Sequence, residues 1–347
     1  MGTEEIYDFI ESAPLEAILR SYPAALDFLK NMRLSELNLQ LSLGDALKTA
    51  GREILEDFGM DAEDCLDQMA DFILTMTECG KPAEQVESIT IVGGRAKDGV
   101  SEDCGLTIPR GEVVSIVGPT GSGKSRLLAD VECLAQGDTL TGRRILVNGQ
   151  KPDETTRTAF SGGLVAQLSQ NMNFVMDLTV EEFLRMHARS RQVPNENEAI
   201  ARCHTCANEL SGEKFSLNVK VTQLSGGQSR ALMIADTACM SASPIVLIDE
   251  IENAGIDRIK AVRLLMQEGK IILISTHDPL LALNAGRRLV MKNGGIRAIL
   301  ETSETEKRAQ AMLMRVDAGL SKLRQALRGG DQIAKSTLEG LFDVDDV

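Results

Sequence analysis

The amino-acid sequence predicts an α/β fold preceded by a small all-helical domain. Two observations carry this prediction: apolar side chains recur at helical spacing in the first eighty residues, whereas short apolar strips alternate with helical segments from residue 88 onward. The 347 residues are enough for about two to three domains, and 43% hydrophobic with 25% charged residues is the balance of a globular protein. Aromatic residues make up only 3%, so we expect no stacking platforms for bases and no nucleic-acid partner.

Four helices are expected before residue 80. Ser12 precedes the first helix as a cap would, Gly59 ends the third, and Asp61 caps the fourth. The first helix is interrupted at Tyr22-Pro23, because proline lacks the backbone N–H that a helix interior needs. The apolar stripes of the four helices cover residues 15–22, 25–32, 47–58 and 66–76.

Negative charge is concentrated in this helical region. Residues 1–88 contain 19 Asp and Glu against 6 Lys and Arg, a net charge of −13 out of −14 for the whole chain. Such a surface repels phosphate backbones and favours a basic or metal-bearing partner. We therefore expect residues 1–80 to form an acidic docking domain for a client protein and 81–87 to be a linker. A solvated acidic surface without a partner is an equally good interpretation.

The chain beyond the linker reads as strands and helices in alternation. We expect an α/β domain at 88–301 that contains a helical subdomain at about 170–242, followed by a C-terminal helix and acidic tail at 302–347. One amphipathic helix is expected at 304–328. The predicted strands lie at residues 88–92, 112–117, 144–147, 163–166, 244–248, 271–275 and 288–291.

No segment of the sequence predicts a membrane span or a secretion signal. The longest apolar strips are strand-sized, far from the roughly 20 residues that a transmembrane helix requires. The N-terminus lacks the basic start and apolar middle of a signal peptide. We therefore expect a cytoplasmic protein whose seven cysteines are buried or free thiols.

A glycine-rich segment after the second predicted strand matches the pattern G-x-x-x-x-G-K-[ST]. In this context backbone N–H groups turn inward around phosphate oxygens, Lys124 reaches the β- and γ-phosphates, and Ser125 can ligate Mg2+. The segment consists of Gly118, Pro119, Thr120, Gly121, Ser122, Gly123, Lys124 and Ser125.

A second fixed string, Leu-Ser-Gly-Gly-Gln, precedes a predicted helix at Ala231–Ala235. It comprises Leu224, Ser225, Gly226, Gly227 and Gln228. With the glycine-rich segment it makes residues 88–301 resemble an ATP-binding cassette (ABC) ATPase, the ATP-binding protein of ABC transporters, in which LSGGQ is the signature motif. The resemblance implies a P-loop cassette with a RecA-like core and a helical signature subdomain, with ATP and Mg2+ as cofactors.

Residues 244–250 match the strand and acidic pair that follow the signature in this family. A buried strand that ends in two carboxylates places Asp249 to hold Mg2+ through water, and Glu250 to orient and deprotonate the attacking water. The resemblance also makes His277 the switch histidine that contacts the γ-phosphate. Of the family's D-loop, usually Ser-Ala-Leu-Asp, only the apolar position and Asp257 are retained in residues 254–257.

The glutamine that the family places near Mg2+ has two candidates. Gln167 directly ends a predicted strand, whereas Gln170 keeps the usual distance to residues 178–182 and is preferred as a catalytic and metal-contacting residue. The aromatic that usually stacks on adenine has no counterpart, because Phe, Tyr, Trp and His are absent from residues 73–159. Arg95 or an apolar side chain would have to take its place.

Two further features stand outside the nucleotide motifs. Cys203 and Cys206 form a lone C-x-x-C pair, which we interpret as incidental thiols because a metal site needs more ligands. Residues 15–25, 43–47 and 59–61 resemble the small helical domain of ScdA-type iron-sulfur repair proteins. The cysteine pair of that domain is replaced by residues 33–37, which favours protein docking over metal binding.

The family resemblance implies a head-to-tail dimer, with itself or a related cassette, that closes on two ATP molecules and reopens on hydrolysis. In each site Ser225 and Gly227 of one protomer would face Lys124 of the other. The acidic N-terminal domain favours a soluble, non-transport ATPase acting on a metalloenzyme or its maturation complex. The alternative is the nucleotide-binding subunit of a membrane transporter, peripheral to the membrane, whose permease docks near residues 170–176. A nucleotide-gated binding module with little turnover is disfavoured by the presence of Glu250 and His277.

Overall fold

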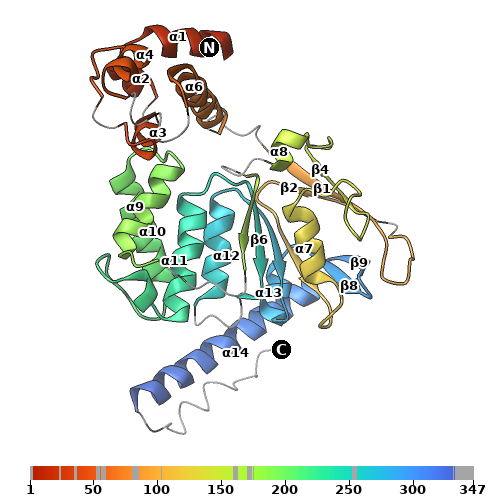
Figure 1. The fold of residues 1–347 in the computed structure, drawn as a ribbon. Coiled ribbons are helices and arrows are strands. Elements are labelled where there is room, and N and C mark those ends of the chain that lie inside the picture. Colours follow the sequence, from red (N-terminus) through yellow and green to blue (C-terminus); the bar gives the residue numbers. More distant parts are fainter. Residues whose placement is uncertain are drawn as a thin grey trace. The chain divides into compact units, whose positions relative to one another are not determined.

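The structure is a computed structural model that describes residues 3–22, 25–34, 37–51, 55, 60–79, 86–102, 104–158, 163–169, 174, 176–251, 256–330 and 332 (Figure 1). The chain divides into two compact units, Met1–Glu84 and Gln85–Val347. Each unit has its own hydrophobic core.

The first unit is helical. Its core contains apolar side chains from every helix, among them the fully buried Leu15, Leu43 and Met69. Its elements are α1 (Thr3–Ser12), α2 (Leu15–Ser21), α3 (Ala25–Asn31), α4 (Leu43–Ala46), a π-helical turn (Leu47–Gly51) and α6 (Ala62–Cys79).

The helices of this unit differ from the sequence prediction in three places. Helix α1 (Thr3–Ser12) has no counterpart among the four predicted helices. Ser12 caps no helix; it is the last residue of α1, and its hydroxyl donates to the carbonyl of Asp8. The third predicted helix begins earlier, at Leu43, where the Ser42 hydroxyl accepts from the N–H of Asp45. Most of residues 52–59, including the predicted stop at Gly59, lie outside the described part. The cap at Asp61 is confirmed, because its carboxylate accepts from the N–H groups of residues 63 and 64.

The second unit is built on two sheets. An antiparallel sheet has the order β2 (Gly105–Pro109), β1 (Ser88–Val92), β4 (Arg144–Val147). A larger sheet has the order β5 (Val165–Leu168), β6 (Ile245–Asp249), β7 (Ile271–Ser275), β3 (Val113–Val117), β8 (Arg287–Lys292), β9 (Gly295–Glu301). Its strands are parallel except β9, which pairs antiparallel with β8.

All seven predicted strands are present, and the structure adds β2 and β9. The strand expected at 163–166 begins at Val165 instead, so Gln167 lies inside β5 and does not follow it. The predicted helix at 304–328 is confirmed as α14.

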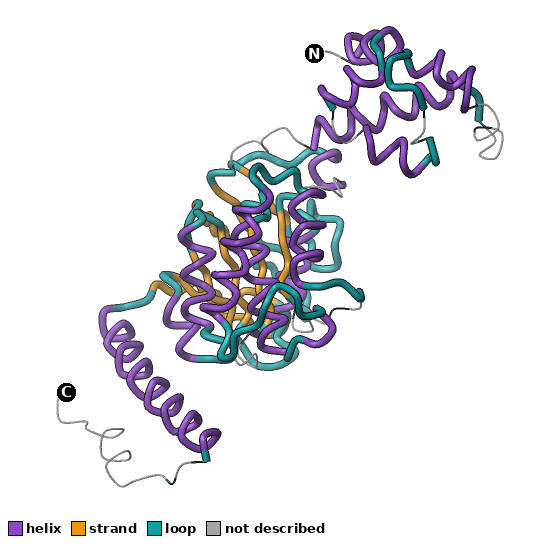
Figure 2. The backbone as a smooth tube through the Cα atoms, turned by 90° about the vertical axis from the view of Figure 1, so that its left-hand side faces the viewer, coloured by secondary structure: helices purple, strands orange, loops and turns teal. Residues whose placement is uncertain are grey.

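Helices cover both faces of the larger sheet (Figure 1). Apolar side chains of α7 pack with those of the antiparallel sheet in one core, while α11 and α12 pack against the central strands in another. Figure 2 shows the strands enclosed by helices. The helices are α7 (Lys124–Glu132), α8 (Glu154–Thr158), α9 (Val180–Ser190), α10 (Glu196–Leu210), a 3-10 turn (Val221–Gln223), α11 (Gly226–Cys239), α12 (Arg258–Gln267), α13 (Pro279–Asn284) and α14 (Glu304–Gly329).

Two further helical features complete this unit. Helices α9, α10 and α11 share a separate core around Phe183 and Leu232. Helix α14 is held to the rest of its unit by polar contacts, such as Arg258 to Asp317 at 2.9 Å and Gln310 to Asn284 at 3.0 Å. Within the described ranges, no helix is both long and apolar enough to cross a lipid bilayer.

Candidate active site

The predicted phosphate-handling residues meet at the carboxyl ends of three neighbouring strands, β6, β7 and β3. The glycine-rich loop follows β3, the carboxylates of Asp249 and Glu250 stand at the end of β6, and His277 follows β7. In parallel sheets the carboxyl edge is where ligands bind, because loops and helix N-termini gather there. The fold therefore brings three separate stretches of sequence to one place.

The loop at 118–125 requires glycine at two positions. A Cβ atom on Gly118 would lie 2.4 Å from the carbonyl oxygen of Met291 and 2.7 Å from the Ser122 hydroxyl. Gly123 has φ +103 and a Cβ there would lie 2.9 Å from the Cα of Gly294. Gly123 also caps α7, so the loop leads its backbone N–H groups into a helix N-terminus, the geometry that binds phosphate.

Lys124 is buried, and its ammonium lies between the loop and His277. Its Nζ donates to the carbonyl of Gly118 at 3.1 Å and lies 3.0 Å from Nε2 of His277. The same Nε2 lies 3.3 Å from the carboxylate of Glu250. The three residues thus form one contiguous group.

The residues present at the end of β6 fit a hard divalent cation. The Ser125 hydroxyl lies 3.3 Å from Oδ2 of Asp249. The other carboxylate oxygen, Oδ1, is buried and has no hydrogen-bond partner among the described residues. A buried carboxylate oxygen without a donor is costly, and Mg2+ prefers such oxygen ligands. Ser125 and Asp249 could therefore hold the metal, as the sequence predicts.

A buried ion-pair network around Arg143 supports the glycine-rich loop. Arg143 is fully buried, and its guanidinium donates to Glu102 at 2.9 Å, to Asp130 of α7 at 2.9 Å and to the carbonyl of Gly294 at 2.8 Å. Gly294 in turn donates from its N–H to the carbonyl of Ser122 at 2.8 Å. The network thus ties the loop, the start of β4 and the β8–β9 turn together. Sequence reasoning missed Arg143, since an arginine carries no mark of burial in one sequence.

The pKa of Glu102 is the result of opposing effects in this network. Burial raises it, but hydrogen bonds from Arg143 and from the N–H groups of Gly94 and Ile296, with the charge of Arg143, outweigh burial and hold the pKa of Glu102 below its ordinary value of 4.5. Glu102 is therefore ionised at neutral pH, and its charge completes the pair with Arg143.

The signature residues are ordered but stand apart from the loop. Ser225 caps α11: its hydroxyl accepts from the N–H of Gln228, whose side chain accepts in return from the N–H of Ser225. A Cβ atom added to Gly226 would have no neighbour within 4 Å. Within the described residues no hydrogen bond or ion pair joins Ser225, Gly226, Gly227 or Gln228 to residues 118–125.

The remaining predicted site residues are not gathered at the strand ends. Asp257 caps α12, accepting from the N–H of Lys260 at 3.0 Å. The side chain of Gln167 lies against Glu132 of α7. With its amide nitrogen facing that carboxylate, Gln167 donates a hydrogen bond to it. Gln170 lies outside the described residues, so its assignment stays a prediction. Arg95 is exposed.

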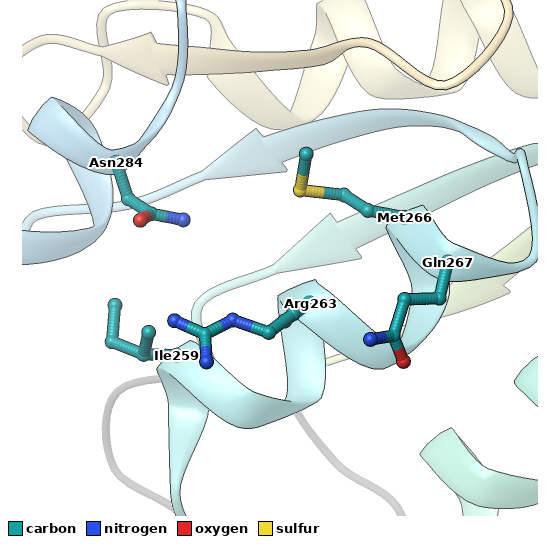
Figure 3. Close-up of a pocket in the computed structure, with 5 residues that line it drawn as sticks. All are labelled: Ile259, Arg263, Met266, Gln267 and Asn284. Atoms are coloured by element: carbon teal, nitrogen blue, oxygen red, sulfur yellow. The ribbon is translucent and has the colours of Figure 1, made fainter.

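A surface hollow of about 420 Å³ lies away from these residues (Figure 3). It contains no predicted site residue, and we assign it no part in nucleotide binding. Its lining consists of Ile259, Arg263, Met266, Gln267 and Asn284.

Comparison with known proteins identifies the fold and its chemistry. Residues 101–253 match the family model described as ABC transporter. An uncharacterized ABC transporter ATP-binding protein of Methanocaldococcus jannaschii is 52% identical over 250 residues, which cover 72% of this chain and 95% of that protein. This chain belongs to the ABC transporter ATP-binding protein family. It is therefore an ATPase that binds ATP with Mg2+ and hydrolyses it.

Two further relatives bear on this cassette. The macrolide export ATP-binding/permease protein MacB of Aggregatibacter actinomycetemcomitans is 33% identical over 219 residues, covering 60% of the cassette chain and 32% of MacB. The cassette chain thus matches about a third of MacB. The structure of CbiO1 of Clostridium perfringens, part of the ABC transporter complex CbiONQ, covers 69% of the cassette chain and 98% of its own, with a TM-score of 0.50 and 21% identity. It shows a shared fold.

Proposed function

We propose that this chain is the nucleotide-binding subunit of an ABC transporter. The observation that carries the proposal is the convergence of Lys124, Asp249, Glu250 and His277 at the carboxyl ends of β3, β6 and β7. The relatives support the choice of role, since they are named as ATP-binding proteins of ABC transporters or as an ATP-binding/permease protein.

Each residue of the group has a role that its chemistry suits. Lys124 and the loop N–H groups bind the β- and γ-phosphates, so the contact between Lys124 and His277 gives way to the nucleotide. Glu250 is the general base that orients and deprotonates the attacking water. His277 holds the γ-phosphate beside it. Ser125 and Asp249 hold Mg2+, which neutralises phosphate charge when bound.

The separation of the signature segment from the loop supports a dimer. The N-terminus of α11 presents the Ser225 hydroxyl and the open backbone at Gly226, which suit a phosphate, yet they make no contact with Lys124 in their own chain. In a head-to-tail dimer the α11 terminus of one protomer completes the site of the other. ATP then joins the two protomers, and hydrolysis releases them.

The transport role differs from the soluble, non-transport role that the acidic N-terminal region favours. MacB carries its ATP-binding part and its permease in one protein by name, whereas this chain has no described membrane-spanning helix. In the proposed transporter the cassette lies peripheral to the membrane, in contact with a permease. Segment 170–176, most of which lies outside the described residues, is the proposed contact.

The test is affinity purification of the tagged full chain from detergent-solubilised membranes of its own organism. We expect a multi-span membrane protein to co-purify in stoichiometric amount and to raise the ATPase rate after reconstitution. Recovery of the chain only with soluble partners, at an unchanged ATPase rate, would contradict the transport role and favour the soluble ATPase.

A further inference from the structure

Helix α14 carries a strip of apolar side chains that its own unit leaves open to solvent. Val316, Leu320 and Leu327 are 39%, 42% and 61% exposed, and Leu323 between them is partly exposed. We call these four residues the α14 seam. Exposed apolar side chains that lie in a row mark a contact surface, whereas scattered ones do not.

The seam begins where the polar attachment of α14 to other elements ends. The last such bond along the helix joins Asp317 to Arg258 at 2.9 Å. Among the described residues, no hydrogen bond or ion pair joins residues 318–329 to another element. The seam therefore lies along the half of α14 that these bonds leave unattached.

The spacing within the seam is that of a coiled coil. Its residues follow one another at intervals of four, three and four, so they form a narrow strip along one side of the helix. A helix that packs against the core of a globular domain needs a broader apolar face. The strip thus suits one other helix lying alongside, and the same strip on a second copy of this chain matches it in length.

Two charges on one flank of the seam make α14 complementary to itself. Asp317 and Arg324 are one heptad apart, and each directly follows a seam residue, so both lie on the same side of the strip. Asp317 accepts from Arg258 through Oδ1 and stays 36% exposed, which leaves Oδ2 for a second donor. Arg324 is exposed and makes no ion pair among the described residues.

These charges select one arrangement of two such helices. An antiparallel pair brings the same flank of both helices together, whereas a parallel pair sets this flank against the uncharged residues 312, 319 and 326. When Leu320 of one copy lies opposite Leu323 of the other, Asp317 of each copy faces Arg324 of the other. Sliding the helices by one heptad would bring Asp317 against Asp317, or Arg324 against Arg324, which like-charge repulsion disfavours.

We propose that the α14 seam binds the α14 seam of a second copy of this chain, as an antiparallel pair of helices in that register. Four apolar layers form, with Leu320 against Leu323 in the two central layers and Val316 against Leu327 in the two outer ones. Ion pairs between Asp317 and Arg324 flank the layers. A seam of two heptads is short, so the pair is weak, with a dissociation constant in the micromolar range or above.

This contact is separate from the nucleotide-dependent dimer. It uses no residue of the glycine-rich loop or of the signature segment, and it requires no ATP. A weak link of this kind raises the local concentration of one cassette near another, so it favours closure on ATP without replacing it. The inference goes beyond the proposed function, and its test does not depend on a permease.

The experiment is sedimentation equilibrium of the full chain without nucleotide, in EDTA, from micromolar to hundreds of micromolar protein. We expect a monomer–dimer equilibrium that Leu320→Glu weakens about tenfold or more, because the substitution puts a carboxylate into both central layers. Met314→Glu is the matched control, since Met314 is also 42% exposed on α14 but lies off the seam. Circular dichroism and ATP binding verify that both variants are folded.

A charge exchange tests the register. Arg324→Glu sets a carboxylate against Asp317, and Asp317→Lys sets an ammonium against Arg324. Each variant alone should therefore dimerise several-fold more weakly than the native chain. An equimolar mixture of the two variants should recover the native affinity, because both ion pairs of the mixed dimer again join opposite charges.

Three results would overturn the proposal: a native chain that stays monomeric over this range, equal weakening by Leu320→Glu and Met314→Glu, or a mixture that associates no more tightly than its components. A parallel assay uses vesicles of equal parts phosphatidylglycerol and phosphatidylcholine. Vesicle binding by a monomeric native chain that Leu320→Glu abolishes would assign the seam to a membrane surface instead.

Discussion

Glu250, the predicted catalytic base, has an unusual backbone conformation. Its φ is +49, in the left-handed region that costs a non-glycine residue about 1 kcal/mol or more. The N–H of Glu250 donates to the carbonyl of Ser275 at 3.0 Å, which fixes this turn directly after the buried strand β6. The turn directs the carboxylate toward His277, 3.3 Å away. The strained backbone of Glu250 thus places its carboxylate beside His277.

Replacing Lys124 tests the phosphate contact. Lys124→Ala should weaken ATP binding by roughly 1.5–3 kcal/mol, a tenfold to hundredfold change in Kd, because a charged hydrogen bond to the phosphates is lost. Titration calorimetry measures it. Lys151→Ala, which removes an exposed lysine, serves as the control. An unchanged affinity in Lys124→Ala would show that the phosphates bind elsewhere.

Replacing Arg143 tests the buried network. Arg143→Met leaves the buried carboxylates of Glu102 and Asp130 without their cation. The free energy of unfolding should therefore fall by about 3–5 kcal/mol at pH 7. Glu102 has a lowered pKa in the native protein, so its stabilising effect is present above its ordinary value of 4.5 and lost as the pH falls further. The deficit of the variant should accordingly shrink below that pH.

Urea unfolding at several pH values gives this deficit directly. Arg144→Met removes an exposed neighbour and should change stability by less than about 0.5 kcal/mol. Equal stability of Arg143→Met and the native protein at pH 7 would rule out a bracing role for the network.

At the scale of the element, the β8–β9 hairpin supports the glycine-rich loop. Asn293 and Gly294 form its two-residue turn, with φ values of +51 and +84, and the turn packs against Gly123. A turn with positive φ at both central positions suits the right-handed twist of the strands it joins. The hairpin therefore fixes the position of the N-terminus of α7.

Gly123→Ala tests this packing. The added methyl would lie 2.9 Å from the Cα of Gly294, so we expect both lower thermal stability and at least tenfold weaker ATP binding. Gly149→Ala is a matched control, since Gly149 also has a positive φ of +76 but nothing within 4 Å of the added atom. Equal losses of stability in both variants, with ATP binding intact, would attribute the effect to backbone strain alone.

The same elements show what one sequence can predict. The motifs at residues 118–125 and 249–250 could be placed at strand ends, because the chemistry of each requires a strand directly before it. Strands β2 and β9 were missed, although Asn293-Gly294 is a recognised hairpin signal that would have indicated β9. The burial of Arg143 depends on tertiary packing, which a local pattern does not record.

At the scale of the whole molecule, the first unit contains none of the described residues that meet at the strand ends. Deleting residues 1–80 should therefore leave basal ATPase activity within a few-fold of the full chain. If this acidic region is the proposed docking domain, the deletion should abolish capture of its partner. That capture by the full chain should also weaken with added salt, since exposed charges are screened.

Pull-downs and phosphate-release assays with both forms decide this prediction. Loss of ATPase activity on truncation, with no partner lost, would mean that these helices belong to the cassette itself. The likeness of this region to ScdA-type domains stays a prediction.

The central claim, that two such cassettes close on ATP and that Glu250 then drives hydrolysis, is tested most directly by Glu250→Gln. We measure molar mass by light scattering with MgATP, together with phosphate release, and use Glu301→Gln, at an exposed residue of β9, as the control. The account predicts an ATP-bound dimer that loses most of its hydrolysis, because the amide binds like the acid but does not accept a proton. A Glu250→Gln variant that hydrolyses ATP at the native rate, or that stays monomeric with MgATP bound, would contradict it.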